Sequence, residues 1–361
     1  MSTSFARRVV KTCLRIGSND RVAIFTWGHT IDLAEDLEIE CRKAGAQTHT
    51  EVYTDKIFYE TLKKCSVEYL RAPNPFELAL ADIATANIFI KGPENPEQLK
   101  QIPTEKWNAL SKADKPFYNR LFERKIRSAE IGLGHVTPQR AKTYGFNFDT
   151  WKQNVHDALD VRYEEMQKLG ERVRSILGKT KRVHLTSTNG SDLTLTLADR
   201  PINVYDGVVD EEDVKRGGVF VSLPSGTVEV APMETGADGT FISNVPEPTT
   251  GLLAHSVRWA FEKGKITSFS GGENIDAVKD SWEKGTGDKD RIGRFTLGLN
   301  PRAKTGFLQN QIVLGTVSIG IGENVNIGGK NESNWGFLTT LSEPTVELDG
   351  KQIIEKGRLV M

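Results

Sequence analysis

Apolar and polar residues alternate along the first half of the chain with the periods of helices and strands. The pattern predicts an amphipathic helix over residues 5–16, a β-rich run over 21–26, a helix over 30–43 and an alternating strand over 47–54. A strand, a helix and a second strand in succession form a βαβ unit, so a parallel sheet is expected. The apolar run 86–90 is typical of a strand that is buried on both faces.

The pattern changes near the middle of the chain. Residues 104–179 are predicted to be mostly helical, with a long amphipathic helix from Tyr163 to Leu177. Beyond them, an Asn-Gly turn at 189–192 between two alternating runs predicts a β-hairpin. We therefore predict an α/β N-terminal domain with a parallel sheet over residues 1–178, and a β-rich α+β domain over 179–361. Further strands of the second domain are expected at 218–222, 227–230, 266–269, 295–298, 313–319 and 345–348.

Composition excludes several classes of partner. The 47 Lys and Arg residues nearly cancel the 48 Asp and Glu residues, whereas nucleic acids and anionic membranes select a basic surface. No apolar run reaches the roughly 18 residues of a membrane span, and no signal peptide is expected. The three cysteines, Cys13, Cys41 and Cys65, form no CxxC pair. A cytoplasmic protein without disulfides or a cysteine-based metal site is therefore expected.

Two histidines of the first domain attract attention by their positions. His29 lies in the turn Trp27-Gly28-His29-Thr30 between a predicted strand and a predicted helix, where open α/β sheets bind ligands. The turn is not a GxGxxG motif, so a dinucleotide site is not supported. A turn or capping role is favoured for His29 over a functional one. His135 has no acidic partner at helical spacing and is interpreted as a solvated or hydrogen-bonded surface histidine.

Six short segments have sequences that are more specific than turn formation requires. They are Lys43-Ala44-Gly45-Ala46, Arg140-Ala141-Lys142-Thr143-Tyr144-Gly145, Leu223-Pro224-Ser225-Gly226, Gly298-Leu299-Asn300-Pro301-Arg302-Ala303, Gly320-Ile321-Gly322 and Gly328-Gly329-Lys330-Asn331-Glu332-Ser333. In order and spacing the chain resembles the aminopeptidase T/aminopeptidase S family of metallopeptidases and its relative, the 2,5-dihydroxypyridine 5,6-dioxygenase. This resemblance covers about residues 9–350. It implies an α/β domain, a β-rich catalytic domain of the aminopeptidase T type, and a homodimer.

The resemblance also implies metal sites, and this chain departs from them. The aminopeptidases use carboxylates and histidines to hold two metal ions that activate water, and the dioxygenase holds Fe(II) with two histidines and an aspartate. The matching positions here are Thr227, Arg294, Ser318, Gly336 and Leu338. No histidine follows His255, and the permanent cation of Arg294 repels a divalent ion. No metal and no other cofactor is therefore expected.

Polar groups remain where the resemblance places the metal cleft. Arg294 and Glu229 are the candidate catalytic residues, since a guanidinium can hold a carboxylate or an oxyanion and Glu229 can act as a general base. The alternative is a salt bridge from Arg294 to Glu229 or Glu234 that fills the space of the metals. For Trp335 the choice is between stacking on a planar ligand and filling space. The candidate substrate-binding residues are Thr227, Asn300, Ser318, Asn334 and Trp335.

Three functions are compatible with this pattern. The favoured one is a metal-free, divergent aminopeptidase T-like protein that binds or transforms a small anionic or planar molecule. The alternatives are an active aminopeptidase-type hydrolase with unrecognised metal ligands, and a non-catalytic subunit or scaffold. Catalysis itself stays open, with a hydrolase-like or other metal-independent enzyme favoured. The expected partner is a small molecule, with no nucleic acid and no membrane.

Overall fold

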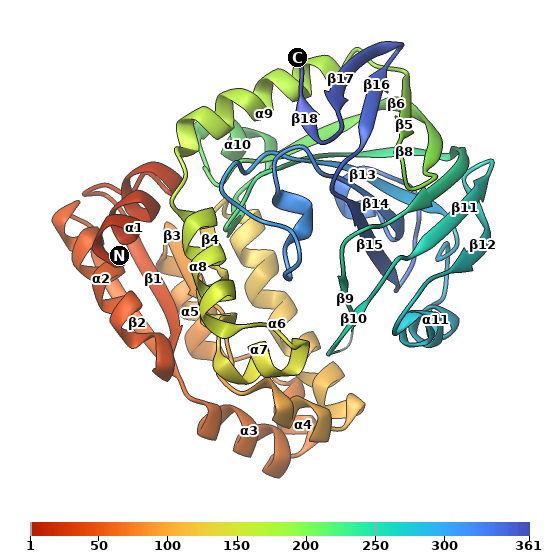
Figure 1. Cartoon of the computed structure of the whole chain (residues 1–361). Coiled ribbons are helices and arrows are strands. Elements are labelled where there is room, and N and C mark those ends of the chain that lie inside the picture. The colour runs from red at the N-terminus through yellow and green to blue at the C-terminus, as the bar shows by residue number, and fades with distance from the viewer. Residues whose placement is uncertain (1, 250) are drawn as a thin grey trace. The chain divides into compact units, whose positions relative to one another are not determined.

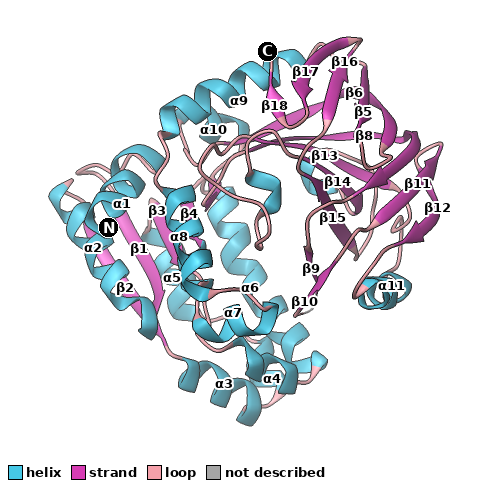
Figure 2. Ribbon diagram, in the orientation of Figure 1, coloured by secondary structure: helices cyan, strands magenta, loops and turns pink. Residues whose placement is uncertain are grey.

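The computed structural model describes residues 2–249 and 251–361 and divides the chain into two compact units. Unit 1 comprises the chain up to Val155 together with Gly207–Pro224. Unit 2 comprises His156–Asp206 and the chain from Ser225 onward. Figure 1 follows the chain through both units by colour, and Figure 2 separates their helices from their strands.

A five-stranded sheet forms the centre of unit 1, in the order β2-β1-β3-β4-β7. Every neighbouring pair in this sheet is parallel, as the βαβ pattern predicts. Both faces of β1 are buried, which explains its nearly continuous apolar run. The strands are β1 (Arg21–Trp27), β2 (Gln47–Tyr53), β3 (Ala86–Ile90), β4 (Arg127–Ile131) and β7 (Phe220–Leu223).

Helices surround this sheet and complete the core of unit 1. Phe25 of β1 stacks on Phe89 of β3 with ring centroids 5.0 Å apart, and Phe117 of α6 meets Phe25 edge-on at 5.7 Å. Aromatic contacts of this kind add to the free energy gained by burying the rings. The helices are α1 (Ser2–Arg8), a π-helix (Val9–Cys13), α2 (Ile31–Lys43), α3 (Asp55–Lys64), α4 (Val67–Arg71), α5 (Pro75–Ile83), α6 (Thr104–Glu123), α7 (Pro138–Tyr144), α8 (Phe148–Leu159) and α10 (Glu211–Arg216). Helix α8 continues into unit 2.

Two strands of unit 1 differ from the sequence prediction. Strand β4 interrupts the region that we predict to be mostly helical, and its sequence RSAEI carries no apolar run. The strand predicted at 218–222 exists as β7, but it pairs in parallel with β4 of unit 1 instead of joining the second sheet. Helix α9 (Tyr163–Leu177), which has the predicted bounds, lies in unit 2 because it packs on β6 and β8.

Unit 2 is built on an eleven-stranded antiparallel sheet. Its main path runs β15-β14-β13-β8-β6-β5-β16-β17-β18, and β11 extends it by pairing with β8 and β12. The predicted hairpin at 189–192 joins β5 to β6. The strands are β5 (Arg182–Thr186), β6 (Asp192–Tyr205), β8 (Thr227–Ile242), β11 (Arg258–Glu262), β12 (Lys265–Ser270), β13 (Ile292–Gly298), β14 (Val317–Gly322), β15 (Gly336–Leu341), β16 (Thr345–Leu348), β17 (Lys351–Glu355) and β18 (Arg358–Leu359).

Smaller elements accompany this sheet. A two-stranded ribbon joins β9 (Glu247–Thr249) to β10 (Leu252–Ala254), and α11 (Ile275–Lys284) precedes β13. A parallel sheet with helices and a large antiparallel sheet together confirm the predicted fold class. None of the helices that the structure describes combines the length and the apolar character that crossing a bilayer requires.

The central strands of the large sheet have one apolar and one polar face. Val228, Leu297 and Val317 face one side and are buried. Helix α9 covers this side, and its Gly170 is so close to Val204 of β6 that an added Cβ would lie 2.5 Å from the valine side chain. Because side chains alternate along a strand, the residues between the apolar ones face the other side. That opposite side carries the residues of the candidate site.

Candidate functional site

The strand register brings the expected metal-ligand positions to one face of the sheet. Residues directly opposite each other on antiparallel strands point to the same side. Thr296 of β13 lies opposite both Glu229 of β8 and Ser318 of β14. The same register places Arg294 opposite Gly320. This polar face therefore carries all five positions at which the resemblance expects metal ligands. They are Thr227, Arg294, Ser318, Gly336 and Leu338.

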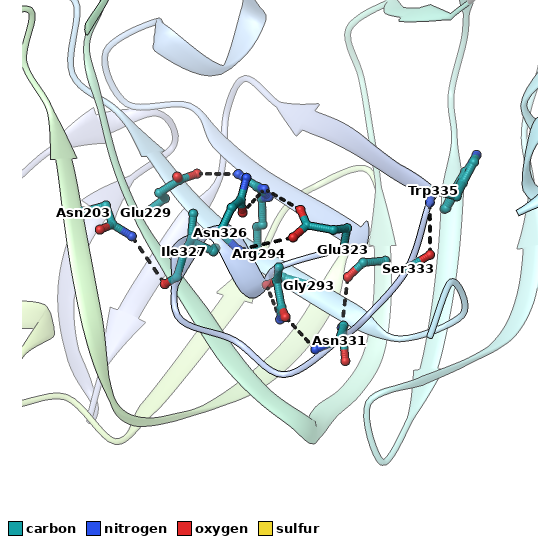
Figure 3. A network of polar contacts seen from close by, with 12 residues as sticks. Asn203, Glu229, Gly293, Arg294, Glu323, Asn326, Ile327, Asn331, Ser333 and Trp335 are labelled. Carbon is teal, nitrogen blue, oxygen red and sulfur yellow. Dashed lines mark hydrogen bonds and ion pairs between the residues drawn. The ribbon is translucent and has the colours of Figure 1, made fainter. Parts of the chain in front are cut away.

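Arg294 lies at the centre of a polar cluster on this face (Figure 3). One terminal nitrogen of its guanidinium donates to Glu229 Oε2 at 3.3 Å. The other donates to Asn326 Oδ1 at 2.7 Å and to Glu323 Oε2 at 3.4 Å. The positive charge of Arg294 is therefore matched by two carboxylates. Glu234, the other acid considered as its partner, instead forms a two-pronged ion pair with Arg200 at 2.6 and 2.7 Å.

Glu229 is the most buried charged group of this cluster, with 7% of the residue exposed. It accepts a hydrogen bond from Arg294. Burial and the negative charge of Glu229 raise the pKa of Tyr205, which belongs to β6, far above its ordinary value. The neutral hydroxyl of Tyr205 therefore lies in the surroundings of the carboxylate, and the candidate base Glu229 already has Arg294 as a donor.

Asparagine side chains shape the backbone beside Arg294. Asn324 Nδ2 donates to the carbonyl of Gly293 at 3.1 Å, and Asn331 Nδ2 donates to those of Ile292 and Gly322 at 2.8 and 3.0 Å. The register of β13 and β14 shifts between residues 292 and 294. The amides bind backbone carbonyls on both strands beside this irregularity, so they fix the backbone from which Arg294 projects.

A second polar network occupies the same face farther along the strands. Ser318 Oγ lies 2.9 Å from Thr340 Oγ1, and both residues are fully buried. The backbone N–H of Thr340 donates to the carboxylate of Glu247 on β9. Burial raises the pKa of Glu247 to about 8. Thr296 lies between the two networks, because it pairs with Glu229 on one side and with Ser318 on the other. Its Oγ1 is buried and has no hydrogen-bond partner.

Three of the candidate binding residues make contacts that do not involve the cluster around Arg294. The amide of the buried Asn300 donates to the carbonyls of Ala158 and Ser225, both at 2.8 Å, so this side chain ties chain segments together. Asn334 accepts from the backbone of Thr286. Trp335 donates to Ser281 and stacks on Phe337 at 6.2 Å, which agrees with the space-filling alternative. Thr227 and Ser318 do share the polar face.

Sequence reasoning did not single out three residues that the fold brings into this region. Glu323 follows the Gly320-Ile321-Gly322 turn directly, and that position was a usable signal. Tyr205 reaches Glu229 through β6, whose register with β8 shifts twice and therefore could not be counted from the sequence. Glu247 belongs to a three-residue strand with no marked pattern.

The residues at the expected ligand positions do not fit a divalent metal. A threonine, an arginine, a serine, a glycine and a leucine offer no carboxylate or imidazole, and these are the groups that hold zinc or iron besides thiolates. The guanidinium of Arg294 occupies the centre of that face. In the described parts of the chain, no cluster of three or more His, Cys, Asp or Glu residues is arranged to hold a metal ion.

Comparison with known proteins agrees with this architecture. The family model for the thermophilic metalloproteases (M29) matches residues 2–308. The structure is similar to that of wild-type AmpT from Thermus thermophilus, with a TM-score of 0.78, 17% identity, and coverage of 100% of this chain and 99% of that one. It is also similar to 2,5-dihydroxypyridine dioxygenase from Pseudomonas putida KT2440, with a TM-score of 0.67, 16% identity, and coverage of 99% and 96%. No curated protein matches the sequence. These findings confirm the resemblance read from the six segments.

Proposed function

Because the chain belongs to the M29 family of thermophilic metalloproteases but has non-ligand residues at the five expected metal positions, we propose that it functions without those metals. It binds a small anionic molecule, with planar anions as the first class to test, on the polar face around Arg294. The cluster of Arg294, Glu229, Glu323 and Asn326 is the observation that carries this proposal.

The distances around Arg294 support an exchangeable anion position. Charge-assisted hydrogen bonds are usually about 2.7–2.9 Å long, and only the contact to Asn326, at 2.7 Å, falls in this range. The contacts to Glu229 and Glu323, at 3.3 and 3.4 Å, are longer. The Glu323 side chain is also 32% exposed. A ligand carboxylate can therefore take the place of Glu323 while Glu229 keeps the guanidinium in position.

Glu229 has a defined part in this proposal. It accepts a hydrogen bond from Arg294 and so orients the guanidinium toward the ligand. Its carboxylate has acceptor positions that Arg294 leaves free, so it can also take a proton from a bound molecule as a general base. The catalytic form of the proposal therefore depends on the binding form, which brings that proton to Glu229.

Affinity for benzoate, a planar anion, tests the proposal against benzamide, its neutral analogue. Glu323→Gln removes the competing carboxylate and is expected to strengthen benzoate binding. Arg294→Lys keeps the charge but loses the planar fork, and is expected to weaken it about tenfold or more, as for hydrogen bonds to charged groups of roughly 1.5–3 kcal/mol. Arg258→Lys, at an exposed position of β11, is the matched control. Equal binding of benzoate and benzamide, or no binding of either, overturns the proposal.

The two alternatives have their own readouts. An aminopeptidase-type hydrolase would cleave leucine p-nitroanilide after addition of Zn²⁺ or Co²⁺, and a scaffold would neither cleave it nor bind benzoate. A homodimer is part of our proposal for the assembled protein, and light scattering of the full chain tests it. A monomer would remove the dimer and leave the ligand site unaffected.

A further inference from the structure

In the parallel sheet of unit 1, the order in which the chain adds strands reverses between β1 and β3. From β1 the chain adds β2 on one side, and then β3, β4 and β7 on the other. In open α/β sheets, ligands bind beyond the carboxyl ends of the strands at such a point. At this edge lie the turn 28–30 after β1, the segment 91–95 after β3 and the turn 132–135 after β4.

Two imidazoles tie these three segments together. His29 Nε2, after β1, lies 2.9 Å from the carbonyl of Gly134, after β4. His135 Nε2, also after β4, lies 3.3 Å from the carbonyl of Gly92, after β3. Gly134 packs so closely that an added Cβ would lie 1.6 Å from the carbonyl oxygen of Lys91. The edge is therefore a fixed arrangement in which His135 is partly buried and hydrogen-bonded, which agrees with the hydrogen-bonded alternative for this residue and not with the solvated one.

Positive charge gathers around His135. Besides burial, the charges of Arg140 and Lys91 and a smaller effect of His29 lower the pKa of His135 to about 3. Lys91 is paired with Glu130 at 2.5 Å. Arg140 differs from Lys91, since it forms no salt bridge with any residue that the structure describes, and its buried Nε has no hydrogen-bond partner. Burial lowers the pKa of Arg140, and an opposing effect comes from Tyr144 and Tyr59, with no carboxylate among its causes.

Two acids of unit 1, Asp55 and Glu97, are engaged in other contacts. The carboxylate of Asp55 accepts the backbone N–H groups of Glu94 and Asn95 at 3.0 and 2.9 Å. Glu97 accepts from the hydroxyl of Thr143 at 3.2 Å. A buried N–H group without an acceptor is costly, so the Nε–H of the partly exposed Arg140 favours binding of an acceptor. The planar fork of arginine matches the two oxygens of a carboxylate or a phosphate.

We propose that the carboxyl edge of the unit 1 sheet is a second binding site, in which Arg140 takes the carboxylate or phosphate group of a small molecule and His135 a hydroxyl group of it. Arg140 donates to the oxyanion. His135, neutral and held through Nε2 by Gly92, offers Nδ1 to a hydroxyl of the same ligand. This site lies within unit 1 and is independent of the site around Arg294 in unit 2.

Calorimetric titration of the full chain at low ionic strength tests this site with inorganic phosphate and with succinate. Saturable binding of phosphate identifies a phosphorylated ligand class, and saturable binding of succinate identifies a carboxylate class. Either result supports the site when Arg140→Gln weakens it tenfold or more. Arg120→Gln is the matched control, since it removes another unit 1 guanidinium, one paired with Asp82 on the surface.

Further variants keep the test decisive if Arg140→Gln folds poorly. Arg140→Lys retains the charge and is expected to weaken binding severalfold. Circular dichroism and melting temperature establish that each variant is folded. Absence of saturable binding for both anions overturns the proposal. So does an equal loss in Arg140→Lys and Arg120→Gln.

Discussion

Arg294 of β13 donates a hydrogen bond to the buried carboxylate of Glu229 on the neighbouring strand β8, at 3.3 Å. A carboxylate at this depth depends on its donors, because burial without a partner costs several kcal/mol. Arg294 therefore has a structural part on the polar face as well as the proposed part in ligand binding. The two parts respond differently to substitution.

Replacement of Arg294 by methionine is expected to lower the free energy of unfolding by about 2–4 kcal/mol, because it leaves Glu229 buried without its cation. The double variant Arg294→Met/Glu229→Gln is expected to recover much of this loss, since it removes the uncompensated charge. Urea unfolding of the wild type, both single variants and the double variant provides a double-mutant cycle. Additive losses would show that the two side chains do not stabilise each other.

Elemental analysis is expected to find zinc, iron, manganese and cobalt well below one ion per chain. The physical reason is the donor set at the five ligand positions and the cation among them. Treatment with EDTA is then expected to leave the melting temperature unchanged. One tightly held ion per chain, removed by EDTA with a drop in melting temperature, would contradict this expectation.

Glu247 is expected to make the stability of the protein fall as the pH rises. Its pKa is about 8 in the folded protein and about 4.5 in the unfolded chain, so the folded state holds more protons between these values. The free energy of unfolding therefore decreases from about pH 4.5 to about pH 8 and levels off above that range. Glu247→Gln keeps an acceptor for the N–H of Thr340 and is expected to remove this decrease.

Unfolding at pH 5 and at pH 8 measures the effect. Glu247→Gln should gain stability relative to the wild type at pH 8 and less or nothing at pH 5. Glu262→Gln, at an exposed position of β11, controls for a general change of charge. A difference between Glu247→Gln and the wild type that does not vary with pH would mean that the buried carboxyl does not titrate in this range.

Gly134→Ala is expected to lower the free energy of unfolding by about 2–4 kcal/mol, because the new methyl group would overlap the backbone carbonyl of Lys91. Gly17→Ala is the matched control, since nothing lies within 4 Å of its added Cβ. Thermal unfolding of the two variants compares them directly. Equal melting temperatures would show that the segment after β4 can move away from β3 without loss.

The sequence predicts those elements whose own residues carry the signal. Strands β1 and β3 are mostly apolar because both of their faces are buried, and α9 has a clear helical period. Strand β4 is equally internal, but Arg127, Ser128 and Glu130 interrupt its pattern, and the buried Ser128 is satisfied by the carbonyl of Ile126. Contacts of this kind depend on the folded environment and produce no periodic pattern of apolar residues in the sequence.

The same limit applies to the candidate site. The shared face of Thr227 and Glu229 follows from the period of two along a strand, and so does the opposition of Thr296 and Ser318 once the strands are paired. The approach of Tyr205 to Glu229 does not follow from it, because bulges in β6 shift the pairing with β8. Side-chain partners across a bulged pair depend on geometry that counting residues cannot supply.

The return of residues 207–224 to unit 1 has a consequence for biosynthesis. A ribosome releases β1 to β4 first, and β7 emerges only after β5 and β6 of unit 2 have been made. Until then, the backbone groups of β4 that pair with β7 have no strand beside them, and such an open edge is a template for pairing with other nascent chains. The N-terminal unit therefore completes its sheet late in translation. A fragment that ends at residue 178 would keep the β4 edge unpaired.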